Sequence, residues 1–304
     1  MKKAALLFAA LPLAGLLAAC GGDTQSGGTR VVASFYPYAY VAEQVGGTHV
    51  DVDNLTSPGV EPHDVELKPK QVGAVQGADV IVYQRGFQSA VDDAVDQADR
   101  SGDDVLDVAK IVSLDDEHAA HSDEGDSHEH EGYADPHTWL DPTTMITVAK
   151  AIEERLTKAD PDHASAFAAN TRRLERELTR LDTAFADGVK TCRTRTIVTS
   201  HAAFHYLAER YRLTQVPIAG IDPTNEPTPS QLADISALVK REGITTIFTE
   251  ELVSPAIADT VARETGARTA TLDPIEGLGD NDGETYLTLM KRNLDAIRAA
   301  NGCS

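Results

Sequence analysis

The chain has 304 residues, of which 41% are hydrophobic and 25% charged, and its formal net charge at pH 7 is −21. This length is comfortable for two α/β lobes, and this composition predicts a folded protein rather than a disordered one. The surplus of negative charge excludes binding to nucleic acid or to an anionic surface through a general electrostatic field, and it would attract cations.

The N-terminus has the features of an exported lipoprotein. Two lysines precede an apolar stretch, 4–17, which is too short to span a membrane comfortably and has the right length for a signal peptide. The letters LAAC that follow resemble the bacterial lipobox, in which the cysteine, here Cys20, becomes the lipidated first residue of the mature protein. An ordinary secretory signal with a chance cysteine is the alternative.

We therefore expect a signal peptide over 1–19 and a flexible tether over 20–29. Acyl chains on Cys20 would hold the mature protein on the outer face of the cell membrane, which is an extracytoplasmic location.

Two stretches of the chain follow the same plan, which predicts an α/β fold of two lobes. The segment 31–47 has the pattern of a buried strand, a turn and an amphipathic helix, and so has 197–209. The two align with an offset of 166 residues, and the same offset places an apolar strand at 79–84 on another at 245–250. Because strands alternate with helices in both halves, we expect each lobe to hold a parallel sheet.

A helical tract lies between the two repeats. One helix over 143–158 ends at Asp160, and a second begins at Pro161, a favoured first-turn residue, and continues to about Lys190. A helix of this length, rising about 1.5 Å per residue, would span both lobes as a rigid rod. The expected organisation is an N-terminal lobe over 30–158, a linking helix over 159–190 and a C-terminal lobe over 191–304.

Three histidines lie at the ends of predicted strands or in loops, where open α/β sheets bind ligands. His63 follows one strand, His137 precedes a helix and His201 directly follows another strand, while the carboxylates of Asp273 and Glu276 follow a further short strand. Three imidazoles and one carboxylate form a tetrahedral set that suits a borderline divalent ion such as Zn²⁺.

The neighbours of these histidines support a ligand role. Pro62 and Pro136 fix the backbone immediately before two of them. Asp64 and Asp141 are available as acceptors for ring N–H groups, although the sequence does not say which of them serves.

Five segments carry a resemblance to a known family. In chain order they are GVEPHDVELKP (59–69), ADPHTWLDP (134–142), TSHAAFHYLAERY (199–211), GIDPTNEPTPSQL (220–232) and LDPIEGL (272–278). They resemble the metal-binding solute-binding proteins of ABC importers, in the zinc-specific branch called cluster A-I or TroA-like. The resemblance covers essentially the whole mature chain.

This resemblance implies two lobes joined by a long backbone helix, with one metal ion in the cleft between them. It also implies a monomer that carries Zn²⁺ as its transported ligand to a membrane permease with a cytoplasmic ATPase. Carried over residue by residue, the ligands are His63, His137 and His201.

The resemblance leaves the fourth ligand open. Some members use an aspartate at the place of Asp273 and others a glutamate at the place of Glu276, and this chain has both. We prefer Asp273 slightly, and water is a third alternative. Manganese-binding relatives carry a glutamate where His201 stands, so the third imidazole favours zinc over manganese or iron.

An insert over 115–131 holds four histidines among eight acidic residues. Since it has no core-forming pattern, it is expected to be a mobile loop over the mouth of the cleft. The resemblance implies an accessory metal-capturing role for it, and a solvated spacer is the alternative. Its histidines are His118, His121, His128 and His130. The one tryptophan, Trp139, is expected in the wall or core rather than as a ligand.

Two cysteines remain after Cys20. In an oxidising compartment Cys192 and Cys303 are expected to be bridged, which would tie the last helix to the first strand of the second half.

Two functions of different classes fit these features. The first is capture of Zn²⁺ outside the membrane and its delivery to a permease. The second is a secreted zinc hydrolase, which needs an open coordination position and a base such as Glu61 or Glu276. The sequence has no nucleophile-elbow motif and no P-loop. Four protein ligands would close the site, so we expect carriage without catalysis. A third idea, adhesion, has no direct support in the sequence.

Overall fold

The structure is a computed structural model that describes residues 27–100, 102–114, 134–278 and 283–304. The signal peptide, Cys20 and the histidine-rich insert lie outside these residues, so the expectations about them stay predictions. In the part of the chain that is described, no helix has both the length and the hydropathy that a membrane crossing requires.

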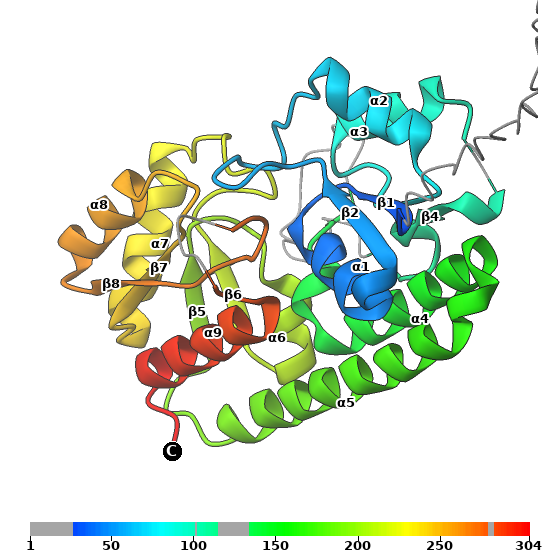
Figure 1. The fold of residues 1–304 in the computed structure, drawn as a ribbon. Coiled ribbons are helices and arrows are strands. Elements are labelled where there is room, and N and C mark those ends of the chain that lie inside the picture. The colour runs from blue at the N-terminus through cyan, green and yellow to red at the C-terminus, as the bar shows by residue number, and fades with distance from the viewer. Residues whose placement is uncertain (1–26, 101, 115–133, 279–282) are drawn as a thin grey trace, which may run out of the picture.

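The first half of the chain forms a parallel sheet of four strands in the order β2-β1-β3-β4 (Figure 1). The central strands β1 and β3 are nearly continuous apolar runs because helices cover both faces of the sheet. The elements are β1 (Thr29–Ala33), α1 (Tyr36–Gly46), η1 (Gly47–His49), β2 (Val50–Asn54), α2 (Pro69–Gly77), β3 (Val80–Tyr83), α3 (Ser89–Gln97), η2 (Gly102–Asp104), β4 (Val105–Asp107) and η3 (Val108–Lys110), where η marks a 3₁₀ helix.

The second half repeats this topology, with the strand order β6-β5-β7-β8 and parallel pairing throughout. The elements are β5 (Thr196–Thr199), α6 (His205–Tyr211), β6 (Thr214–Pro217), α7 (Pro229–Glu242), β7 (Thr246–Thr249), α8 (Ala256–Thr265), β8 (Arg268–Thr271) and α9 (Tyr286–Asn301). The bounds of β3 and β7 differ by the offset of 166 residues that relates the two halves of the sequence. The prediction of two parallel-sheet lobes is confirmed.

Two helices join the lobes. They are α4 (Pro142–Ala159) and α5 (Ala164–Gly188), with η6 (Pro161–His163) between them. The helix α4 begins where the carboxylate of Asp141 accepts the backbone N–H of Thr143 at 2.7 Å. The 25 residues of α5 make a rod about 37 Å long. This rod packs against α1 and α4 of the first half and against α9 of the second (Figure 1), so the predicted long helix is confirmed.

One hydrophobic core continues through both lobes. The buried face of α5, which includes Leu174 and Leu178, belongs to the same cluster as Phe35 and Trp139 of the first half and Ile297 of α9. Separate clusters lie under α2 and α3 and under α7 and α8. Moving the lobes apart would expose apolar surface of the shared core, which favours a cleft with little hinge freedom.

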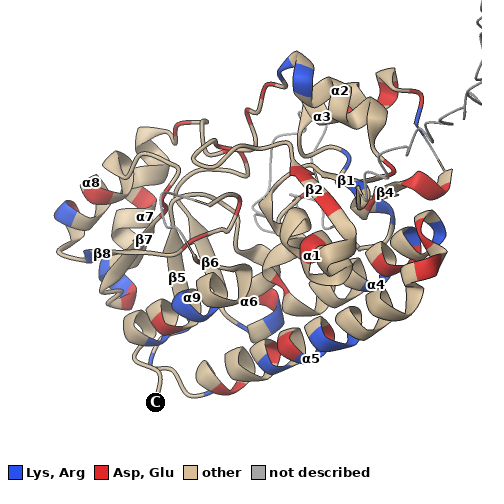
Figure 2. Ribbon diagram, viewed as in Figure 1, with Lys and Arg blue, Asp and Glu red and all other residues tan. Residues whose placement is uncertain are grey.

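Charged side chains avoid this interior. The strands β5 and β7 carry no charged residue, whereas acidic and basic residues alternate along the outer surface of α5 (Figure 2). Charged residues of the described strands are found outside β5 and β7, for example Asp51 and Asp53 in β2.

A disulfide bond links Cys192 to Cys303, as the cysteine content predicts. Cys192 precedes β5 and Cys303 follows α9, and the backbone N–H of Ser304 donates to the carbonyl of Thr191 at 3.0 Å. The end of the chain is thus fixed to the beginning of the second sheet.

Candidate metal centre

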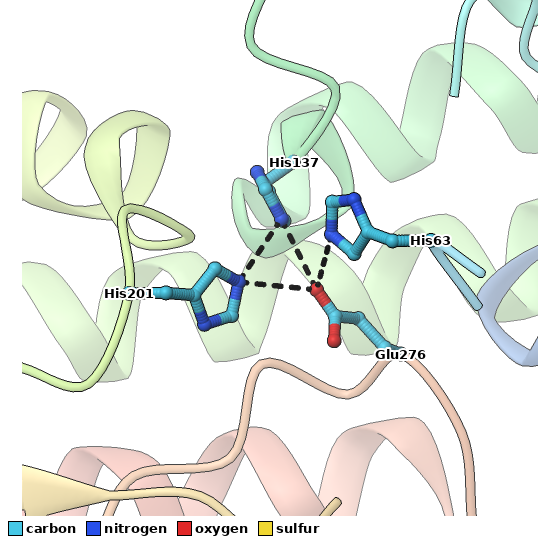
Figure 3. A group of neighbouring side chains, drawn as sticks. All are labelled: His63, His137, His201 and Glu276. Carbon is cyan, nitrogen blue, oxygen red and sulfur yellow. Dashed lines mark hydrogen bonds and ion pairs between the residues drawn. The ribbon is translucent and has the colours of Figure 1, made fainter. Parts of the chain in front are cut away.

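Three histidines and one glutamate from distant parts of the chain meet between the lobes (Figure 3). His63 lies in the loop between β2 and α2, and His137 directly precedes the 3₁₀ helix η5 (Thr138–Leu140). His201 stands two residues after β5, and Glu276 lies in the loop between β8 and α9. Each offers one ligand atom, and all four atoms lie within 4.8 Å of one another.

The spacing of these atoms fits a single small cation. Oε1 of Glu276 lies 3.1 Å from Nε2 of His137, 3.4 Å from Nε2 of His201 and 3.5 Å from Nε2 of His63. The Nε2 atoms of His137 and His201 are 3.4 Å apart. Tetrahedral ligands at zinc bond lengths of about 2.0–2.1 Å stand about 3.3 Å from one another. These four separations are therefore close to those of a zinc coordination shell, and all six lie within 4.8 Å.

The group is withdrawn from solvent. The side chains of His137, His201 and Glu276 are fully buried, and that of His63 is 9% exposed. Among the described residues, Nε2 of His63 and Oε2 of Glu276 find no hydrogen-bond partner of good geometry. Buried polar atoms without partners are costly, and a cation bound at this point would give Nε2 of His63 the interaction it lacks.

Neighbouring carboxylates set the protonation of the imidazoles. Burial lowers the pKa of His201, but the charges of Glu250 and Glu276 outweigh burial and raise this pKa to about 10. Burial also lowers the pKa of His137, and Asp135 and Glu276 likewise raise it above its ordinary value. At His63, burial outweighs Glu276 and the pKa is lowered.

The pKa of Glu276 shifts in the opposite direction from those of His137 and His201. Burial alone would raise its pKa, but contacts with the three imidazoles hold the pKa well below its ordinary value. These contacts therefore favour an ionised carboxylate at Glu276 and protonated imidazoles at His137 and His201, so a cation would compete with protons for these rings.

The ring of His201 is oriented by Glu250, which follows β7 directly. Oε1 of Glu250 lies 2.8 Å from Nδ1 of His201 and accepts the backbone N–H of the same residue at 3.2 Å. A proton held on Nδ1 by this carboxylate leaves the lone pair of Nε2 free for a metal ion.

Asp135 does the same for His137. Its Oδ1 lies 2.7 Å from Nδ1 of His137 and accepts the backbone N–H of His137 at 3.0 Å. The intervening carbonyl of Pro136 accepts a hydrogen bond from Nε2 of Gln84 at 2.8 Å. Both the ring and the backbone of this ligand are thus fixed.

The sequence pointed to other acceptors for these ring N–H groups. Asp64 is exposed, and Asp141 caps α4 instead, so Asp135 and Glu250 take the role expected of them. The position of Asp135, two residues before a histidine in a proline-restricted loop, is a signal that could have identified it. Glu250 is distant in sequence and only the fold brings it to His201.

At the fourth position the structure brings Glu276 to the histidines and engages Asp273 elsewhere. Oδ1 of Asp273 accepts the backbone N–H of Ile275 at 2.7 Å, and Oδ2 accepts from Nη2 of Arg292 at 3.1 Å. These contacts hold a tight turn in which Ile275 has a φ of 58°, and the turn directs Glu276 towards the histidines. The geometry does not support the preference for Asp273.

Trp139 forms part of the wall beside the site. It is fully buried, and its Nε1–H donates to the carbonyl of Pro274 at 2.7 Å. Its ring lies 5.0 Å from that of His137, centroid to centroid. The tryptophan thereby connects the segment of His137 to the loop that carries Glu276.

Comparison with known proteins agrees with this geometry. Residues 31–300 match the family described as "Zinc-uptake complex component A periplasmic". The chain is 35% identical to the zinc-binding lipoprotein AdcA of Streptococcus pneumoniae, over 98% of this chain but only 61% of the length of that protein. It is 34% identical to the high-affinity zinc uptake system protein ZnuA of Bacillus subtilis, over 98% of this chain and 97% of the relative.

The fold is also similar to that of a solved zinc-bound structure. The crystal structure of the Zn(II)-bound ZnuA-like domain of Streptococcus pneumoniae AdcA superposes with a TM-score of 0.75 at 33% identity. The match covers 90% of this chain and 99% of that one.

Proposed function

Because the chain belongs to the family of periplasmic components of zinc-uptake complexes, we propose that it captures Zn²⁺ outside the cytoplasmic membrane and delivers it to the permease of an ABC importer. The observation that supports the proposal is the convergence of Nε2 of His63, His137 and His201 and Oε1 of Glu276, all within 4.8 Å of one another, which suits one small cation such as Zn²⁺.

Binding in this scheme exchanges protons for the metal ion. The Nδ1–H groups of His137 and His201 stay with Asp135 and Glu250, while both Nε2 atoms give up protons and turn their lone pairs to the ion. The two positive charges of the ion then face three carboxylates, those of Asp135, Glu250 and Glu276. This compensation makes a dry site acceptable for a divalent cation.

The donor set supports zinc as the cargo. Three imidazole nitrogens and one carboxylate oxygen suit a borderline ion, whereas manganese and iron(II) lie lower in the affinity order for such nitrogen-rich sites. Both relatives are named for zinc, the one as a zinc-binding lipoprotein and the other as a zinc uptake protein, which agrees with this choice of ion.

The same set of donor atoms favours transport of zinc over zinc-dependent catalysis. A hydrolytic zinc site keeps one coordination position open for water, whereas the four side chains proposed here would fill all four positions. We therefore propose that the protein is not an enzyme, and that it acts as a monomer tethered through lipid on Cys20 and docks on a permease powered by an ATPase.

Metal and turnover measurements on the purified mature chain test this function. We expect one zinc ion bound tightly enough to compete with a chelating dye, weaker binding of Mn²⁺, and no hydrolysis of generic ester or phosphate substrates. The variant His201→Ala should lose the tight ion. Hydrolysis that rises with zinc occupancy would favour a hydrolase instead, and tighter binding of Mn²⁺ would overturn the choice of cargo.

A further inference from the structure

A zinc ion needs a path to a group whose ligands are almost entirely covered. Of the four ligand side chains, only that of His63 retains any exposure, and this is 9%. The group of ligands therefore faces outward at His63. Two cavities lie beside the loop that carries this residue.

A cavity of about 630 Å³ has His63 in its wall. On one side it is lined by the start of α3 and the turn before it, including Ser89 and Asp92, and on the other by the loop 220–225 of the second lobe, including Asp222 and Asn225. Ser89 and Asn225 are exposed, whereas Phe87 and Pro136 deeper in the lining are buried. This "His63 cavity" thus leads from the surface to the metal centre.

Two carboxylates face this cavity from opposite lobes. Oδ1 of Asp222 accepts the backbone N–H and the hydroxyl of Thr224 at 2.8 and 2.7 Å, which fixes the side chain in a tight turn. Burial raises the pKa of Asp222, but these hydrogen bonds and the imidazoles of His63 and His201 outweigh it and lower the pKa. An ionised carboxylate is therefore held within electrostatic reach of two of the proposed ligands.

The second carboxylate lies on α3. Oδ2 of Asp92 accepts the backbone N–H of Gly86 at 2.9 Å, while its Oδ1 is buried and finds no hydrogen-bond partner among the described residues. A buried carboxylate oxygen left in this state is unfavourable unless a cation or water approaches it. The basic side chain of Arg85, which acts electrostatically on Asp92, is already paired with Asp96 at 2.6 Å.

A second cavity, of about 430 Å³, lies on the other side of the loop that carries His63. It is lined by the carboxylates of Glu61, Asp64 and Glu226 and by apolar side chains that include Ile218 and Leu252, and none of the four proposed ligands is in its wall. Carboxylates line both cavities, and only the first has one of the proposed ligands, His63, in its wall. This "Glu61 cavity" is therefore the weaker candidate for a path, and it supplies a matched control.

We propose that Zn²⁺ reaches the four-ligand site through the His63 cavity, with Asp222 and Asp92 drawing the hydrated ion in from opposite lobes. Neither residue is proposed as a ligand of the bound ion. Their role is to raise the local concentration of the divalent cation in front of His63, as clefts lined by one sign of charge do. This inference rests on the proposed function and names the route to the same site.

The test is the rate at which Zn²⁺ binds to metal-free protein, followed by stopped-flow fluorescence of Trp139. This residue is the only tryptophan of the chain, and its ring lies 5.0 Å from that of His137. Asp222→Asn and Asp92→Asn are suitable variants because an amide oxygen still accepts the local hydrogen bonds. Glu226→Gln removes the same charge from the wall of the other cavity.

At low ionic strength, each of the two aspartate variants should bind zinc more slowly, on the order of fivefold for a divalent ion and a nearby unit charge. The dissociation rate constant should stay within about twofold, and added salt should shrink the difference, because screening weakens steering. Glu226→Gln should bind at the rate of the unchanged protein. Circular dichroism should verify that each variant is folded.

Two results would overturn the route. One is an association rate that Asp222→Asn and Asp92→Asn leave unchanged or that Glu226→Gln lowers equally. The other is an unchanged association rate with faster dissociation, which would make these aspartates part of the holding of the bound ion. Failure of the proposed function is distinguishable, because then the unchanged protein would itself bind no stoichiometric zinc.

Discussion

Oε1 of Glu250 contacts His201 twice, at 2.8 Å from Nδ1 and at 3.2 Å from the backbone nitrogen. Glu250 is the first residue after β7, and Gln84, 166 positions earlier, is the first residue after β3. Gln84 in turn donates to the carbonyl just before His137. The first residue after the corresponding strand thus supports a histidine segment in both halves. In the second half it is the carboxylate of Glu250, and in the first half it is the amide of Gln84.

The charge on Glu250 should matter for zinc affinity. Glu250→Gln keeps an acceptor for the ring N–H of His201 but removes the charge that supports it, so we expect zinc affinity to fall about 10-fold, within the range measured for such outer carboxylates. Competition with a chelating dye measures the change. Asp141→Asn is the control, since Asp141 caps α4, and its affinity should be unchanged. Equal effects of the two variants would show a general loss of stability instead.

Removing the charge of Glu276 should lower zinc affinity much more than removing the charge of Asp273. Glu276→Gln takes the only anionic ligand from the group and should weaken zinc binding by about two orders of magnitude. Asp273→Asn keeps an acceptor for the N–H of Ile275 and loses mainly its ion pair with Arg292, so the affinity should stay within about threefold. The reverse order of the two effects would restore Asp273 as the fourth ligand.

Zinc binding should release protons, and acid should oppose it. The pKa of His201 is raised to about 10 and that of His137 is raised above its ordinary value, so we expect protonation of both rings to be favoured in the zinc-free protein at pH 6.5. His63, whose pKa is lowered, is neutral there. Since the ion binds neutral imidazoles, about two protons should leave per zinc ion at this pH, and affinity should fall as pH falls.

Calorimetry in two buffers of different ionisation enthalpy counts these protons. A count near zero at pH 6.5 would mean that the imidazoles are already neutral in the zinc-free protein, contrary to the carboxylate contacts seen around them.

The disulfide should contribute to stability and not to metal binding. It closes a loop across 111 positions between the start of the second sheet and the end of α9. The double variant Cys192→Ser with Cys303→Ser should lose about 2–4 kcal/mol of unfolding free energy. Urea unfolding measures the loss, with zinc affinity as the internal control. A large loss of affinity with little loss of stability would contradict this assignment.

Deleting the histidine-rich insert 115–131 should separate two kinds of zinc binding. The insert lies outside the described residues, and every member of the proposed four-ligand set lies elsewhere in the chain. We expect the deletion to leave the affinity of the tight site unchanged and to lower the total zinc bound at high concentration. Metal analysis after equilibrium dialysis measures the affinity of the tight site and the total zinc bound. Loss of the tight site on deletion would contradict the separation of a primary site from accessory binding by the insert.

The repeated pattern of the sequence was sufficient to predict the two sheets and the long helix, because burial on both faces leaves continuous apolar runs such as Val80–Tyr83. It also led to the three histidines, since strand ends meet at one edge of a sheet. Which of Asp273 and Glu276 lies beside the histidines could not be predicted from the sequence. It depends on a left-handed backbone at Ile275, and a β-branched residue gives no local sign of that conformation.

Each lobe supplies two members of the metal group: the first half contributes His63 and His137, and the second half His201 and Glu276. An ion bound by these four side chains would therefore link the two lobes, in addition to being the proposed cargo. We therefore expect the loaded molecule to resist movement between its halves more than the empty one does. The proposed permease could distinguish the two states by this resistance without contacting the ion itself.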